Sequence, residues 1–315
     1  MERSPTIFDS AAERALFQEL QSRWAPKLQL FAQIPLAKLI RLQPPDERLL
    51  RPRHRRYFLS AHVDFTFCWP DGRPLLSVEL DGVGGGFSRE WQYIPKRVTP
   101  DPNRDWKLNF KLRAAARVDY PLIVIAAEET ARLDEAESLT ILDGIVGQLL
   151  SREAERKLVE EMVDDAADKL AGMDPAQAYE YAQDLVLQAG VIADLEHDPL
   201  ALAIAEEQTR CERALGHGYS YSLGLPLYDP PAPCSAAFPP PMEELRARLR
   251  AIKQAARVGA RVAVQTPAGE VAETVWLRNI GQGQGVIPEL VSEQIAHYLA
   301  LRRVSRDFSR RSAVA

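Results

Sequence analysis

The sequence is poor in cysteine and has no long apolar run. Its three cysteines, Cys68, Cys211 and Cys234, lie far apart and form no CxxC motif, which argues against a disulfide framework and against a zinc knuckle. No stretch approaches the roughly 20 apolar residues that cross a bilayer, so we expect no membrane association. The N-terminal segment MERSPTIFDSAAER lacks the apolar core of a secretory signal. These absences predict a cytoplasmic protein.

The composition and the distribution of charge predict more than one soluble domain. The chain has 315 residues, of which 46% are hydrophobic and 26% charged, as is typical of globular proteins with a sizeable core. The net charge of −5 divides unevenly: residues 1–130 carry 20 basic and 16 acidic residues (+4), residues 131–242 carry 7 and 21 (−14), and residues 243–315 carry 12 and 7 (+5). The two basic ends permit contact with phosphate groups.

Residues 1–130 have the patterns of an α/β domain. An amphipathic helix comes first, then a strand, two strands joined by a Pro-Asp-Gly turn, a basic helix and a buried strand. The polar, arginine-rich segment before the hairpin has the pattern of a basic loop. The expected ranges are a helix over Asp9–Trp24, strands over Leu28–Ile34, His62–Trp69 and Pro74–Asp81, a helix over Asn103–Arg117 and a strand over Tyr120–Ala126.

The remainder of the chain divides into three regions. Residues 131–215 form an acidic helical region, residues 216–242 a Pro/Gly-rich linker or arm, and residues 243–315 a small α+β part. Helix breaks or starts are expected at the two Asp-Pro pairs of the acidic region. The expected elements of the C-terminal part are helices over Met242–Val258 and Pro288–Arg302 and short strands over Arg261–Gln265 and Glu273–Ile280.

Three carboxylates lie on the predicted hairpin. Asp64 lies within HVDFTFC, between apolar residues that point the other way, and Glu79 and Asp81 are two apart in LLSVELDG and therefore share a strand face. Carboxylates on buried strands are costly unless a cation compensates them. Mg²⁺ or Mn²⁺ would do so, and such an ion can activate water for attack on a phosphodiester. The cluster therefore predicts a metal site.

These residues carry a resemblance to a known superfamily. The order Asp64, then Glu79-Leu80-Asp81, then Lys107 within RDWKLNF resembles the PD-(D/E)XK, or restriction-endonuclease-like, superfamily, above all its very-short-patch-repair-endonuclease-like branch and related bacterial domains of unknown function. The resemblance spans about 120 residues and implies a core of helix, strand, hairpin, helix and strand. The matching segments are HVDF (62–65), VELDG (78–82), RDWK (104–107) and PLIVI (121–125), preceded by a helix with Glu13 and by Gln33-Ile-Pro-Leu36.

The resemblance also implies roles for these residues. Asp64 and Glu79 would be metal ligands, and Asp81, which stands where the superfamily motif has lysine, a further ligand or a neighbour of the ligands. Lys107 would hold the attacking water or a phosphate oxygen, and Lys111, one helical turn on, is the substitute candidate. Glu13 would reach the metal through water. Apart from the resemblance, the arginine-rich segment offers Arg51, Arg53, Arg55 and Arg56 as candidate DNA contacts, although a solvated loop explains that segment equally well. Arg104 in RDWK is a further candidate contact.

Two functions follow from these residues. The first is a Mg²⁺- or Mn²⁺-dependent DNA endonuclease or nickase in repair, restriction or phage defence. The second is a catalytically inactive nuclease-like scaffold that binds DNA or protein, with residues 131–315 docking a partner or a second copy. The second is favoured by two departures: Val-Gly-Gly-Gly-Phe stands at 83–87, where related domains have a His, and the Glu-x-Lys motif is missing.

Overall fold

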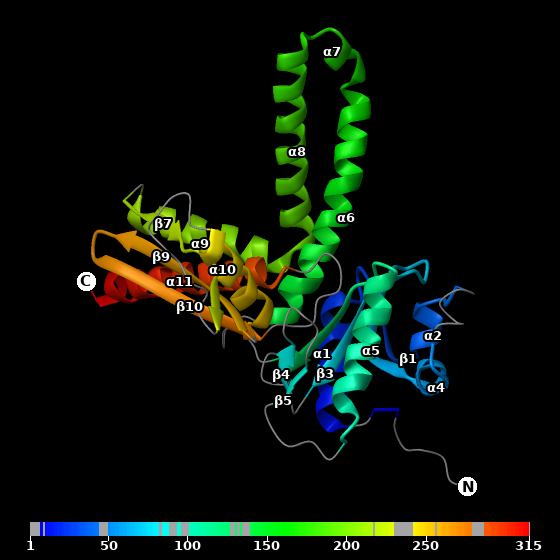
Figure 1. Cartoon of the computed structure of the whole chain (residues 1–315). Helices are drawn as coiled ribbons and strands as arrows, with labels where there is room; N and C mark the ends of the chain where they lie inside the picture. Colours follow the sequence, from blue (N-terminus) through cyan, green and yellow to red (C-terminus); the bar gives the residue numbers. More distant parts are fainter. Residues whose placement is uncertain are drawn as a thin grey trace. The chain divides into compact units, whose positions relative to one another are not determined.

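The structure is a computed structural model in which the chain divides into two compact units. It describes residues 7–8, 10–43, 50–81, 84–87, 93–95, 101–126, 130, 133, 139–216, 218–229, 242–255, 257–278 and 287–314. Unit 1 comprises Met1–Thr130, Leu227–Val258 and Trp276–Pro288, and unit 2 comprises Ala131–Pro226, Gly259–Val275 and Glu289–Ala315. The protein is mixed α/β (Figure 1).

Unit 1 is built on a mixed sheet with the strand order β1-β2-β3-β6. Strands β1, β2 and β3 are antiparallel neighbours, and β6 runs parallel to β3. The elements of the first 130 residues are α1 (Ala11–Trp24), β1 (Gln29–Pro35), α2 (Leu36–Leu39), α4 (Pro52–Ser60), β2 (His62–Cys68), β3 (Pro74–Asp81), β4 (Gly84–Phe87), β5 (Tyr93–Pro95), α5 (Arg104–Arg117) and β6 (Leu122–Ala126).

Helices cover both faces of this sheet. Helix α1 packs on one face, where the ring of Phe17 lies 6.2 Å from that of Phe65. On the other face, Leu108 and Leu112 of α5 join Val124 of β6 in a buried cluster. Because strand residues alternate between faces, the side of β2 and β3 that meets α5 carries the carboxylates, while the side that meets α1 is apolar. The polar side chains are therefore held beneath α5.

Within the first 130 residues, the structure differs from the sequence-based predictions in two ways. The basic loop expected at the arginine-rich segment is wrong, because Pro52–Ser60 forms α4, a helix that begins at a proline and buries Phe58. The structure also contains three short elements that no sequence pattern predicted, namely α2 and the paired strands β4 and β5. The other predicted strands and helices of the first 130 residues are confirmed to within about two residues.

Unit 2 contains a long helical hairpin. Helices α6 (Ile141–Asp165) and α8 (Pro175–His197) lie side by side, with the short α7 (Ala167–Ala171) at their tip (Figure 1). Helix α9 (Pro199–Leu215) follows, so α8 and α9 both begin at the proline of a predicted Asp-Pro pair. The remaining elements of the chain are β7 (Ser220–Leu223), β8 (Leu227–Asp229), α10 (Met242–Gln254), β9 (Arg257–Thr266), β10 (Gly269–Arg278) and α11 (Pro288–Val314).

The C-terminal predictions are confirmed in kind and wrong in extent. The segment expected to be a linker contains β7, which pairs with β9, and β8. Strands β9 and β10 are each 10 residues long, and α11 continues 12 residues beyond Arg302 to Val314. Residues 230–241, which include Cys234, lie outside the described residues. Among the residues described, no helix combines the length and the apolar character that a bilayer crossing needs.

One buried carboxylate in unit 2 leads to a pH prediction. Asp198 caps α9 by accepting hydrogen bonds from the backbone N–H groups of Leu200 and Ala201, and it is 1% exposed. Burial, reinforced by Asp194, raises its pKa to about 6. The folded state therefore holds this proton more tightly than the unfolded state, whose pKa is about 3.9. The resulting stabilisation is present below pH ~4 and is lost as the pH rises through about 6.

We expect Asp198→Asn, which keeps a capping oxygen and carries no charge, to gain stability relative to the wild type between pH 4 and pH 7. The upper limit of that gain in the free energy of unfolding is about 3 kcal/mol, from a pKa shift of about 2 units. Urea denaturation of both proteins at pH 4 and pH 7 measures it. If the free energy of unfolding changed with pH in the same way for both proteins, the raised pKa of Asp198 would be contradicted.

Candidate active site

The hairpin places two carboxylates on the face of the sheet that meets α5. Phe65 pairs with Val78 and Thr66 with Ser77, a register that sets Asp64 opposite Glu79. An Oδ2 atom of Asp64 accepts a hydrogen bond of 2.8 Å from the backbone N–H of Leu80. That bond fixes the Asp64 carboxylate beside β3.

A lysine from α5 reaches this pair. The Nζ atom of Lys111 donates to Oε1 of Glu79 at 2.6 Å and to the backbone carbonyl of His62 at 2.5 Å. Both side chains are buried, with Glu79 6% and Lys111 8% exposed. Burial, with a contribution from the nearby Asp64, raises the pKa of Glu79 to about 7, although Lys111 opposes the rise. Lys111 thus pairs with Glu79, which lies opposite Asp64 on the hairpin, and both members of the pair are buried.

The other predicted residues have different partners. Lys107 forms its ion pair with Asp101, at 2.7 Å between Nζ and Oδ2. Asp81 is buried and accepts from Arg104, at 2.5 Å from Nη2 and 3.2 Å from Nε. Glu13 lies in the first turn of α1, half-buried, and its role stays a prediction. The structure therefore brings together Asp64, Glu79 and Lys111, and it places Lys107 at Asp101.

The donor set of this cluster suits a hard divalent cation. Within the parts of the chain that the structure describes, no group of three or more His, Cys, Asp or Glu side chains is arranged to hold a metal ion. Mg²⁺ needs fewer, since it takes one or two carboxylates and completes its shell with water and phosphate oxygens. Asp64 and Glu79 lie opposite each other on the hairpin, and a cation shared between them would offset the cost of burying the Glu79 carboxylate.

Aromatic side chains of α4 and α5 pack near the cluster, and no sequence motif predicted them. The ring of Tyr57 on α4 packs edge-on against Trp106 at 5.0 Å and Phe110 at 5.7 Å, which joins α4 to α5. Burial raises the pKa of Tyr57, as do the nearby charges of Glu79 and Asp64, so its hydroxyl stays protonated.

Backbone strain also lies next to the cluster. Gln33 has φ 54°, in the left-handed region that residues other than glycine seldom adopt. Its neighbours Ala32 and Ile34 pair with Phe65 and Val63, which places Gln33 level with Asp64 across the β1–β2 ladder. Strained backbone is often retained at functional sites. In the sequence, Gln33 was singled out only because it begins the Gln-Ile-Pro-Leu segment that contributes to the resemblance.

The arginines predicted to contact DNA fall into two groups. Arg53 lies 4.2 Å from the centre of the Trp106 ring and donates to Oδ1 of Asn103, and Arg104 is paired with Asp81. Arg51, Arg55 and Arg56 are exposed at the start of α4. The first group contributes to packing, and the second remains accessible to a polyanion.

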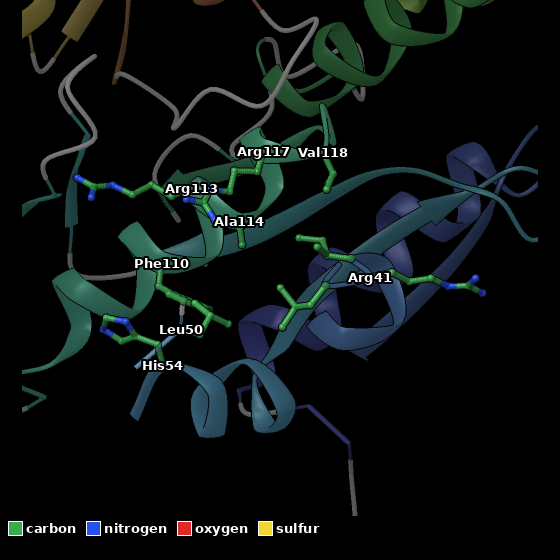
Figure 2. Close-up of a pocket in the computed structure, with 10 residues that line it drawn as sticks. Arg41, Leu50, His54, Phe110, Arg113, Ala114, Arg117 and Val118 are labelled. Carbon is green, nitrogen blue, oxygen red and sulfur yellow. The ribbon is translucent and has the colours of Figure 1, made fainter. Parts of the chain in front are cut away.

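A separate cavity of about 260 Å³ lies against another face of α5. Phe110, Arg113, Ala114 and Arg117 line it from α5, and none of the lining residues is acidic. Figure 2 shows the guanidinium group of Arg41 pointing away from the other lining residues. The cavity is therefore largely apolar, and it is not part of the carboxylate cluster.

Comparison with known proteins gives one similarity. Residues 6–137 match the model of a family described as "Protein of unknown function (DUF2726)", a segment that contains the whole carboxylate cluster. Neither the curated proteins nor the solved structures include one that matches the chain. The similarity thus covers the first α/β region and assigns no chemistry to it.

Proposed function

We propose that residues 1–130 form a restriction-endonuclease-like domain that hydrolyses DNA phosphodiester bonds with Mg²⁺ or Mn²⁺, as an endonuclease or nickase. The observation that carries this proposal is the convergence of Asp64, Glu79 and Lys111 from a β-hairpin and the following helix. The order of helix, hairpin, helix and parallel strand around the cluster supports it. The exposed arginines of α4 supply positive charge for a DNA backbone.

Each residue of the cluster has a distinct role in this proposal. Asp64 and Glu79 would hold the cation, which supplies an activated water and stabilises charge on the phosphodiester. Lys111, already held by the carbonyl of His62, would position the attacking water or a phosphate oxygen. The ion pair with Arg104 fixes the side chain of Asp81 beneath α5. The arrangement is built on strands and a helix, which hold side chains more rigidly than loops do.

The inactive scaffold is the second candidate, because the carboxylates already have internal partners. Asp64 accepts from Leu80, Glu79 from Lys111 and Asp81 from Arg104. Such a network would stabilise the domain without any cation. Calorimetric titration with Mn²⁺ discriminates the two: a catalytic site binds the ion and Glu79→Gln weakens that binding, whereas a scaffold takes up no ion at this site.

Cleavage of supercoiled plasmid DNA tests the proposal directly. We expect the wild-type protein to produce nicked or linear DNA with Mn²⁺ or Mg²⁺ and none with EDTA. Asp64→Asn and Glu79→Gln, which preserve side-chain shape and remove charge, are expected to reduce cleavage to background. The ratio of nicked to linear product separates nickase from endonuclease.

Asp119→Asn is the matched control. Asp119 is exposed in the turn between α5 and β6 and has φ 56°, a conformation that asparagine adopts equally well. This variant loses the same charge and should cleave like the wild type. Undiminished cleavage by Asp64→Asn and Glu79→Gln would contradict the assignment of the site. If the wild type neither cleaves DNA nor binds Mn²⁺, the inactive scaffold is favoured.

A further inference from the structure

Helices α9 and α11 pack together within unit 2. Cys211 of α9 lies in a buried cluster with Ala300, Leu301 and Val304 of α11. Its thiol is 3.5 Å from the carbonyl oxygen of Leu301. This apolar contact fixes the spacing of the two helices, and the polar residues beside it are therefore held at defined positions.

A buried carboxylate orients arginines from both helices. Oε1 of Glu207 accepts from Arg210 at 2.5 Å and from Arg302 at 2.6 Å, and Oε2 accepts from Ser305 at 2.6 Å. The side chain of Glu207 is 1% exposed, whereas that of Arg210 is 46% exposed. One end of the network is thus anchored in the core, and the guanidinium of Arg210 extends to the surface.

Arg210 and Arg302 line a cavity of about 590 Å³. This volume falls within the range of roughly 300–1,000 Å³ that is typical of small-molecule sites. Four arginines line it, two from each helix, and no acidic residue does. Arg213 and Arg306 are exposed, and Arg213 forms no ion pair with the described residues. The remaining lining residues are Ala214, Ser305 and Ser309.

We propose that the α9–α11 arginine cavity binds a phosphate group. A network whose only purpose was to join the two helices would need Arg210, Arg302 and their shared Glu207, but it would not need the exposed Arg213 at the same opening. Guanidinium groups match the tetrahedral oxygens of phosphate with paired N–H donors. The phosphate is either a free anion or part of a DNA backbone.

Binding is measured on the full chain in EDTA, where the proposed nuclease site plays no part. Calorimetry follows inorganic phosphate at constant ionic strength, and fluorescence anisotropy follows a labelled single-stranded oligodeoxynucleotide. We expect Arg213→Ala with Arg306→Ala to raise the Kd by about tenfold per arginine. The matched control is Arg156→Ala with Arg261→Ala, exposed arginines of unit 2 that do not line the cavity.

Each outcome has a defined meaning. Weaker oligonucleotide binding, with a salt dependence reduced by about one phosphate contact per arginine, assigns the cavity to a DNA backbone. Weaker binding of inorganic phosphate alone assigns it to a free anion. If the wild type binds neither probe, or if the cavity and control variants bind alike, the proposal is wrong. None of these results depends on whether the protein cleaves DNA.

Discussion

Lys111→Met is expected to abolish DNA cleavage and to destabilise unit 1, whereas Lys107→Met changes both only slightly. Removing Lys111 leaves Glu79 buried without its ion-pair partner, and because Lys111 holds the pKa of Glu79 down, the carboxyl then takes up a proton at neutral pH. Loss of the buried pair costs up to about 3–5 kcal/mol in the free energy of unfolding. The substitution also removes the ammonium group that is proposed to hold the attacking water. We therefore expect the cleavage rate to fall about 100-fold or more. Plasmid cleavage and urea denaturation measure the two effects.

The Lys107→Met variant is the control, because Lys107 is partly exposed and pairs with an exposed Asp101. Such pairs contribute about 0–1 kcal/mol. A second variant separates stability from chemistry: Glu79→Gln with Lys111→Met removes both charges, so much of the lost stability should return while cleavage stays absent. An inactive Lys107→Met beside an active Lys111→Met would reverse the assignment of the lysine.

The sequence predicted most of the sheet because local signals there agree with the tertiary structure. Strands β2 and β3 alternate between faces, and the Pro-Asp-Gly turn between them fixes their pairing. Helix α4 lacked such a signal. Its arginines resemble a solvated loop, and its position depends on the packing of Tyr57 against Trp106 and Phe110, which are distant in the sequence. Tertiary contacts of this kind have no local pattern.

The two carboxylates could be predicted, but the choice of lysine could not be settled. Spacing shows that Lys107 and Lys111 lie on one side of α5. It does not show how far along the sheet each turn of the helix lies, and that distance decides which lysine meets Glu79. In the structure, Lys107 forms an ion pair with Asp101 in the loop before α5, and Lys111 lies over β3, where it contacts Glu79. The α9–α11 cavity was equally hidden, since its arginines come from segments about 90 residues apart.

Gly147→Ala is the second variant for which we expect a large effect, here on the stability of unit 2. The first turns of α6 are buried, and a Cβ atom added at Gly147 would lie 2.6 Å from Oδ1 and 2.9 Å from Cα of Asp198. The Cα atom is backbone, at the junction where α8 ends and α9 begins, so it cannot move aside without displacing both helices. Overpacking of this kind costs about 1–3 kcal/mol or more. That cost exceeds the gain of about 1 kcal/mol that alanine brings to a helix interior.

Gly190→Ala provides the matched comparison, because Gly190 is also a helix-interior glycine of unit 2. A Cβ atom there would meet only the carboxylate end of Glu155, at 3.5 Å, which is an ordinary contact with a flexible side chain. We therefore expect opposite signs: Gly190→Ala raises the free energy of unfolding by up to about 1 kcal/mol, and Gly147→Ala lowers it. Denaturation curves of the two variants and the wild type measure both changes. If Gly147→Ala were as stable as Gly190→Ala, the close approach of α6 to the α8–α9 junction would be refuted, because helix propensity alone would then account for both substitutions.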